Sequence, residues 1–176
     1  MRILLITDQT PGSTHSAVEG IFGGYLKQHC DVDLVYFSRE QKSPQAHGAS
    51  FILPHRLKRR GTFQGLQAVT DLGSYDAIIV RNLFGALRSV LKNQHRFHFR
   101  VGFWESFPHS FRRLYEAKTT GRARLRKTVE YAIRHRIENS LLARCDFYFP
   151  ITETFRQRFR PTLNIPYLPL PMGVDF

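Results

Sequence analysis

Glu105 is the residue whose position in this sequence most favours acid–base chemistry. It follows an apolar stretch, residues 97–103, that predicts a strand, and its neighbour is Trp104. A carboxyl group beside an indole ring in a partly closed cleft is suited to general-base work, because such surroundings disfavour its charged form. The alternative is a surface glutamate that caps a helix, since Ser106 and Pro108 are typical of helix starts.

Other polar residues also follow predicted strands. Arg81 comes directly after the strand predicted at residues 75–80, where it could bind an anionic group or, equally, form a structural salt bridge. Thr152 lies between a late strand and a helix, and simple capping of that helix is the favoured interpretation. His109 is the second candidate for proton transfer after Glu105. With Trp104, these residues are the candidates for contact with a substrate.

The start of the chain predicts a strand, a loop and a helix in close succession. Four apolar residues, 3–6, indicate a strand buried on both faces, and a polar loop follows at once. The loop contains Gly12, Ser13, Thr14 and His15, and Ser13 or Thr14 can cap the next helix. Backbone N–H groups at such a corner favour an anion. The first strand–helix unit of any α/β protein has the same pattern.

Strands and helices alternate along the rest of the chain. Further strands are predicted at residues 31–37, 51–54, 75–80, 97–103 and 146–151, and helices at 17–26, 63–72, 83–91, 111–144 and 153–159. This alternation predicts an α/β fold, a Rossmann-like parallel sheet with helices on both faces. Ligands of such sheets bind at the carboxyl ends of the strands, which is where the candidate residues lie.

Length and composition indicate one globular domain with an anionic partner. The chain has 176 residues, two distant cysteines, a formal net charge of +12 and a pI near 10.3. No apolar run approaches the roughly 20 residues of a membrane span, and no signal peptide is recognisable. The two cysteines, Cys30 and Cys145, are far apart and form no metal-ligand pattern, so we expect a reduced, cytoplasmic setting and no metal or cofactor. The charge favours nucleic acid, an anionic membrane or a phosphorylated substrate, without choosing among them.

The positive charge is concentrated in two clusters. Arg56, Lys58, Arg59 and Arg60 form the first. The second lies on the helix predicted at residues 111–144 and includes Arg122, Arg124, Arg126 and Lys127. Both clusters fit attraction to an anionic membrane surface, at on the order of 1 kcal/mol per cation; a merely solvated basic helix is the alternative. The same helix carries an apolar stripe with a spacing of four, for which core packing is predicted: Leu125, Val129, Ile133, Ile137 and Leu141.

The order of the motifs resembles a known family. The chain opens on a strand and a small-residue loop, has Tyr-Asp-Ala-Ile-Ile-Val at 75–80 and Cys-Asp-Phe-Tyr-Phe-Pro-Ile-Thr at 145–152, and closes on Leu-Pro-Met-Gly-Val-Asp-Phe at 170–176. It resembles the N-terminal Rossmann-like domain of the two-domain (GT-B) glycosyltransferases, especially the large retaining, family 4-like group that makes bacterial polysaccharides and glycolipids. That family usually has Asn in the closing motif where this chain has Met172.

The resemblance implies an acceptor-side domain, residues 1–176, whose nucleotide-sugar-binding C-terminal domain is absent from the chain. The fragment alone would then be inactive. Its partners would be a nucleotide sugar, a saccharide or lipid-linked acceptor and an anionic membrane, with peripheral association at the inner membrane. By the same resemblance, Gly12 and Ser13 would line the cleft and Glu105 would act near the reacting centre.

Two other kinds of protein remain as alternatives to a glycosyltransferase domain. A basic α/β nucleic-acid-binding domain is compatible with the charge, although no nucleic-acid motif is recognisable and most aromatic residues fall in predicted strands. A flavodoxin-like domain would need an acidic cluster or a flavin loop, and a lone Asp8 is neither.

Overall fold

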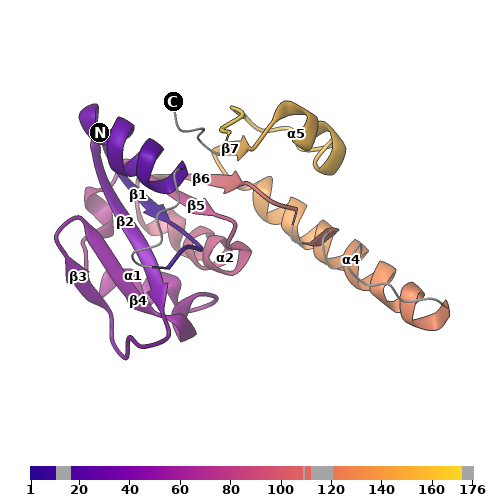
Figure 1. The fold of residues 1–176 in the computed structure, drawn as a ribbon, viewed down its shortest axis with the longest axis horizontal. Helices are drawn as coiled ribbons and strands as arrows, with labels where there is room; N and C mark the ends of the chain where they lie inside the picture. The colour runs from indigo at the N-terminus through magenta and orange to yellow at the C-terminus, as the bar shows by residue number, and fades with distance from the viewer. Residues whose placement is uncertain (11–16, 109, 112–120, 172–176) are drawn as a thin grey trace.

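The computed structural model describes residues 1–10, 17–108, 110–111 and 121–171 (Figure 1). The strands are β1 (Arg2–Ile6), β2 (Asp31–Ser38), β3 (Gln45–His47), β4 (Ser50–Pro54), β5 (Ala77–Arg81), β6 (Arg100–Glu105) and β7 (Phe147–Pro150). The α-helices are α1 (Thr62–Gln67), α2 (Phe84–Asn93), α4 (Gly121–Leu142) and α5 (Glu153–Phe159). A π-helix, Ala17–Tyr25, takes the place of the first predicted helix, and short 3₁₀ turns cover Leu26–Gln28, His55–Leu57, Leu72–Ser74 and Gln94–Arg96.

All seven strands form one sheet in the order β3-β4-β2-β1-β5-β6-β7. Every pair is parallel except β3 with β4, which is antiparallel. Beyond β7, the chain returns along the edge of the sheet, where the Leu168 N–H donates to the Tyr148 carbonyl at 3.0 Å. The predicted α/β fold with a mostly parallel sheet is confirmed.

The sheet has an apolar layer on each face. Along β1 the side chains alternate, so that Leu4 and Ile6 join the larger core with α1, α2 and the end of α4. Ile3 and Leu5 join a smaller core with the π-helix. A strand buried on both faces has no polar side chain to interrupt its apolar run, which is why β1 was recognisable in the sequence.

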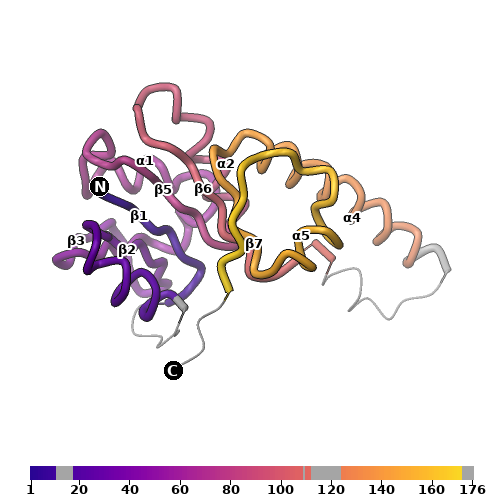
Figure 2. The backbone as a smooth tube through the Cα atoms, turned by 90° about the horizontal axis from the view of Figure 1, so that it is seen from above, coloured from indigo at the N-terminus to yellow at the C-terminus, as the bar shows by residue number. Residues whose placement is uncertain are grey.

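Helix α4 extends well beyond the sheet (Figures 1 and 2). Its last turn packs into the larger core through Leu141 and Leu142. The other stripe residues are exposed: Leu125 by 66%, Val129 by 50%, Ile133 by 57% and Ile137 by 50%. The prediction that the stripe packs in the core is therefore wrong for all but Leu141, because the helix continues past the sheet that would cover it. No helix of the described residues is long and apolar enough to span a membrane.

Candidate functional site

The carboxyl ends of β1, β5 and β6 bring a polar cluster to one edge of the sheet. Asp8 follows β1, Asn82 follows β5 and Ser106 follows β6. The Asn82 side-chain amide donates to Ser106 Oγ at 2.6 Å, and its oxygen accepts from the Ser106 backbone N–H at 2.9 Å. The same amide nitrogen lies 3.5 Å from Asp8 Oδ2. Three neighbouring strand ends are thus joined by side chains at the edge where α/β sheets bind ligands.

Arg81 is held beneath this cluster. Its guanidinium donates to Asp8 Oδ1 and lies over the Trp104 ring, with 4.9 Å between the guanidinium carbon and the ring centroid. Only 2% of the Arg81 side chain is exposed. Burial lowers the pKa of Arg81, and the charge of Asp8 opposes that change. The contact seen is the structural salt bridge, and a direct contact of Arg81 with an anionic substrate stays a prediction.

The backbone turn after β5 depends on Asn82. Its φ of 56° lies in the left-handed region, which Asn adopts more readily than most residues. This conformation goes with the paired bonds to Ser106, which is itself buried. The sequence shows that Asn82 follows a predicted strand, but it does not favour Asn82 over Arg81 as a site residue. Asn82 is recognised as a site residue only from its hydrogen bonds to Ser106 on the neighbouring strand end.

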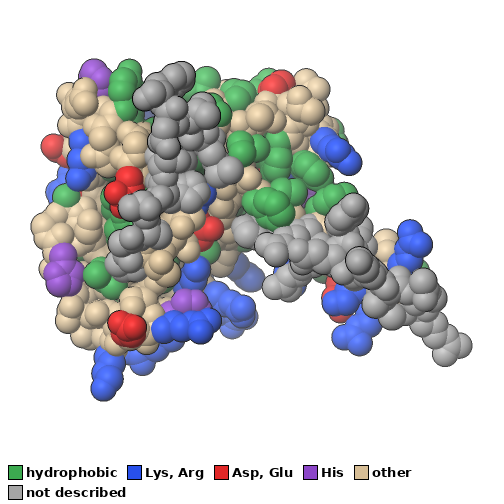
Figure 3. Space-filling model, viewed as in Figure 1, with side chains coloured by type: hydrophobic (Ala, Val, Ile, Leu, Met, Phe, Trp, Pro, Cys, Tyr) green, Lys and Arg blue, Asp and Glu red, His purple; other side chains and the backbone are tan. Residues whose placement is uncertain are grey.

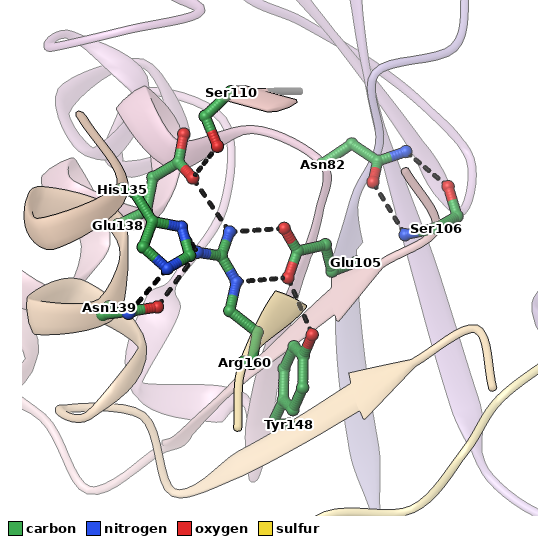
Figure 4. Close-up of polar contacts among 9 residues, drawn as sticks. All are labelled: Asn82, Glu105, Ser106, Ser110, His135, Glu138, Asn139, Tyr148 and Arg160. Carbon is green, nitrogen blue, oxygen red and sulfur yellow. Dashed lines mark hydrogen bonds and ion pairs between the residues drawn. The ribbon is translucent and has the colours of Figure 1, made fainter. Parts of the chain in front are cut away.

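Glu105 lies in a buried ion-pair network behind this edge (Figure 4). Its Oε1 accepts from Arg160 Nη2 at 2.6 Å, and its Oε2 accepts from Arg160 Nε at 3.0 Å. Tyr148 Oη also donates to Oε2, at 2.7 Å. Burial raises the pKa of Tyr148, and the Glu105 charge adds to this effect. Both carboxylate oxygens of Glu105 are therefore occupied by protein groups.

The network continues through Arg160 onto α4. Arg160 Nη2 also donates to Glu138 Oε2 at 2.8 Å, and Ser110 Oγ donates to the same oxygen at 2.8 Å. Burial alone would lower the pKa of Arg160, but the bonds and charges of the two glutamates outweigh it and raise that pKa. One buried arginine, the residue that follows α5, therefore ties β6 to α4.

The structure corrects where two of the predicted residues lie. Glu105 and Trp104 have no exposed surface, so neither the partly closed cleft nor the surface cap expected for Glu105 is correct. The reason is the alternation along β6, where Val101, Phe103 and Glu105 face the larger core. Trp104 faces the smaller core, and its Nε1 donates to the Leu170 carbonyl at 3.2 Å. Catalysis by Glu105 and substrate contact by Trp104 stay predictions.

The remaining candidates divide into described and undescribed residues. Thr152 is exposed, and its Oγ1 accepts from the Phe155 N–H at 3.0 Å, so the predicted capping of α5 is confirmed; substrate contact by Thr152 stays a prediction. Gly12, Ser13, Thr14, His15 and His109 lie outside the described residues. No group of acidic, His or Cys residues in the described ranges is arranged to hold a metal ion.

The two basic clusters lie on different parts of the surface. Arg56, Lys58 and Arg59 line a cavity of about 850 Å³, and Arg59 and Arg60 line a second of about 750 Å³. Burial lowers the pKa of Lys58, opposed by the charge of Asp8. Arg124, Arg126 and Lys127 are exposed on α4. Arg122 also belongs to α4, but its side chain lies outside the described residues.

His135 is the histidine that contacts Arg160 in this network. Its Nδ1 lies 2.9 Å from Arg160 Nη1, and it can accept that bond only while it carries no proton. Burial lowers the pKa of His135, and the positive charge of Arg160 adds to the lowering, against the opposite influence of Glu138 and Glu105. The neutral form is therefore the one that the fold holds.

The lowered pKa of His135 predicts a loss of stability in acid. Below about pH 6.5 the unfolded chain binds a proton at this residue before the folded protein does, so the free energy of unfolding falls until the folded pKa is passed. The expected slope from this residue is at most about 1.4 kcal/mol per pH unit. Urea denaturation between pH 7 and pH 5 measures it: the wild type should lose more stability than His135→Gln. Equal losses in the two proteins, with the exposed-site control His95→Gln matching the wild type, would contradict this role.

Comparison with known proteins supports the fold. No family model and no curated protein matches the sequence. Among solved structures, the chain is similar to an α,α-trehalose-phosphate synthase (UDP-forming) from Burkholderia vietnamiensis, with 11% identity, a TM-score of 0.51, and coverage of 93% of this chain and 43% of that chain. It is also similar to an α-glucosyltransferase in complex with UDP and a 13-mer DNA, with 16% identity, a TM-score of 0.45, and coverage of 95% of this chain and 40% of that chain.

Each of these matches covers only part of the solved structure. The chain spans less than half the length of the solved structures that it matches, 40% to 43% for these two. Its seven-stranded sheet is mostly parallel, and the likeness to the synthase extends over nearly the whole chain. The chain therefore has the Rossmann-like α/β fold that occurs in GT-B glycosyltransferases.

Proposed function

We propose that this chain is the acceptor-side domain of a glycosyltransferase that uses a nucleotide-sugar donor. The observation that carries the proposal is the likeness to a UDP-forming synthase over 93% of this chain and only 43% of that one. A domain that corresponds to less than half of a two-domain enzyme would supply one wall of its cleft. The donor would then be held mainly by a second domain.

The carboxyl edge of the sheet is the part of this chain that would face the cleft. Asp8, Asn82 and Ser106 meet there, and Gly12 to His15 come shortly after β1 in the sequence. The partly exposed Asp8 carboxylate at this edge can accept hydrogen bonds from saccharide hydroxyls, while the buried pair Asn82 and Ser106 fixes the shape of the edge. Glu105, behind the edge, would support its shape through the bonds to Arg160 and Tyr148.

The acceptor in this proposal is a lipid-linked or membrane-proximal saccharide used in cell-surface polysaccharide or glycolipid synthesis. What supports it is α4, where exposed Leu125, Val129 and Ile133 share a helix with exposed cations such as Arg124 and Arg126. An exposed apolar stripe with neighbouring basic residues is the pattern of a helix that lies in a membrane interface. The protein would then sit on the cytoplasmic face of the inner membrane, held by apolar contact and by anionic lipids.

Sugar transfer tests the proposed function. A two-domain protein containing residues 1–176 is expected to transfer sugar from a nucleotide-sugar donor, and residues 1–176 alone are expected to transfer none. The physical reason is that most contacts to the donor phosphates would belong to the second domain. Release of nucleotide and labelling of the acceptor are measured together, so that transfer is distinguished from donor hydrolysis.

A further inference from the structure

A basic groove runs between the segment His55–Arg60, helix α2 and the inner side of α4. It consists of two adjoining cavities of about 850 Å³ and about 750 Å³, which share Arg59, Gly85, Arg88 and Arg134 among their lining residues. The first cavity reaches Asn82 at the carboxyl edge, and the second reaches Lys92 farther along α2. Cavities of this size hold small ligands.

The charge of the groove is almost entirely positive. The cations that line it come from three elements: Arg56, Lys58, Arg59, Arg60, Arg88, Lys92 and Arg134. Within the described ranges, none of them forms an ion pair with a carboxylate. The lining contains one acid, Glu138, whose Oε2 is already bonded by Arg160 and Ser110. Figure 3 shows Lys and Arg side chains gathered along the lower edge of the body in that view, next to the arm that contains α4.

The segment that supplies four of these cations is fixed in place by α2. Ser89 Oγ donates to the Arg60 carbonyl at 2.9 Å and accepts from the Phe63 N–H at 3.1 Å. A Cβ at Gly85 would approach the Arg59 Cα to 3.0 Å, so the absence of a side chain at Gly85 lets the segment contact the helix. The backbone that carries the cations is therefore ordered before a ligand binds, which lowers the entropic cost of binding.

The start of α2 adds a partial positive charge to the same space. Leu83, Phe84 and Gly85 line the first cavity, and the N-cap residue Leu83 offers no side-chain acceptor to the first-turn N–H groups. Those groups and the positive end of the helix dipole favour an anion. The arginines and the helix end therefore act on one volume.

We propose that this groove binds a small ligand that carries two or more phosphate groups. Several unpaired arginines from opposite walls match a compact multiple anion, because guanidinium groups bind phosphate oxygens through paired, charge-assisted hydrogen bonds. A duplex nucleic acid would instead need an open, extended basic face. The groove reaches the proposed acceptor wall at Asn82, so, resting on the proposed function, the ligand is a phosphorylated acceptor.

Titration calorimetry with inorganic pyrophosphate and tripolyphosphate tests the groove independently of sugar transfer. One site per chain is expected. Tripolyphosphate should bind more tightly than orthophosphate, which is titrated as the single-phosphate reference. Arg88→Gln and Arg134→Gln should each weaken binding by about tenfold or more, since a hydrogen bond to a charged group contributes on that scale. Arg124→Gln is the matched control, because it removes one exposed arginine from the same helix as Arg134 but lies outside the groove.

Three outcomes would overturn the proposal. The first is that neither pyrophosphate nor tripolyphosphate shows saturable binding. The second is that Arg124→Gln and Arg134→Gln lose the same affinity. The third is that a single-stranded oligonucleotide binds more tightly than tripolyphosphate. Arg88 and Arg134 are exposed, so their substitution is expected to leave the fold intact. Thermal unfolding of each variant checks that a loss of affinity is not caused by misfolding. A two-domain protein that contains residues 1–176, binds pyrophosphate and transfers no sugar would support the groove and refute the proposed function. Active transfer by that protein without phosphate binding would refute the groove and support the proposed function.

Discussion

Replacing Arg160 by methionine is expected to lower the free energy of unfolding by about 3–5 kcal/mol, because it leaves buried carboxylates without their cation. Glu105 is fully buried and Glu138 nearly so, and Arg160 donates to both. Methionine fills the space of the aliphatic part of the arginine and has no N–H donor, so the substitution removes the charge and the donated hydrogen bonds. The three bonds from Arg160 to the two glutamates would be lost together.

Thermal and urea denaturation measure this effect. In a chain of this size, a loss of 3 kcal/mol corresponds to a fall in Tm of roughly 6–12 °C. Arg158→Met is the matched control, since Arg158 is exposed two residues earlier on the last turn of α5. The account would be contradicted by equal changes in the two variants, or by a loss below about 1 kcal/mol for Arg160→Met, the scale of an exposed ion pair.

The same network changes what a substitution at Glu105 can show. Removing its carboxylate would leave Tyr148 Oη without its acceptor and, among the described residues, Arg160 with Glu138 as its one remaining carboxylate. A loss of activity in Glu105→Ala would therefore not by itself establish catalysis, because a loss of stability is expected as well. Glu105→Gln keeps an acceptor oxygen for Tyr148 and separates the charge from the hydrogen bond.

Substituting the stripe on α4 is expected to weaken binding to anionic vesicles by about 100-fold. The change is Leu125→Gln together with Ile133→Gln, two side chains that are 66% and 57% exposed. Burying one such side chain in an apolar medium contributes about 1.5–3 kcal/mol, and two at the lower end of that range contribute about 3 kcal/mol, which is roughly 100-fold. Both substitutions leave the net charge unchanged, so only apolar contact is tested. Co-sedimentation with vesicles of anionic lipid, at constant ionic strength, gives the partition coefficients.

The control carries the same number of glutamines outside the stripe. Thr128→Gln with Ser140→Gln replaces two exposed polar side chains on the same helix and removes no apolar residue, so its binding should equal that of the wild type. If every variant binds as tightly as the wild type and loses its binding in high salt, the arginines alone attract the membrane and the stripe does not contribute. Equal binding of the wild type to neutral and to anionic vesicles would contradict the membrane proposal as a whole.

The fold could be predicted from the sequence because its central strands are buried on both faces. β1 and β5 have uninterrupted apolar runs, and their predicted ranges agree with the structure to within a few residues. β3 was missed because all three of its residues are exposed, so an edge strand of this kind has no apolar pattern. The predicted strand 97–103 begins later, at Arg100, because a 3₁₀ turn covers Gln94–Arg96.

The candidate site could be predicted only in part, because its connections are not local. Arg160 contacts Glu105 and Glu138, which come 55 and 22 positions earlier in the chain, and neither spacing belongs to a sequence motif. One signal was available: Val101, Phe103 and Glu105 alternate, which places Glu105 on the buried face. The stripe on α4 has the periodicity of a core helix, but periodicity identifies an apolar face and does not show what covers it.

Whether a two-domain protein that contains residues 1–176 transfers sugar decides whether this chain is the acceptor-side domain of a glycosyltransferase. Radiolabelled nucleotide sugars are supplied with vesicles that contain bacterial glycolipids, and label in the lipid fraction is followed over time. Label is expected in the lipid fraction with the two-domain protein, and none is expected with residues 1–176 alone. Transfer by residues 1–176 as the only protein would contradict it, and so would donor consumption by the two-domain protein without any labelled acceptor.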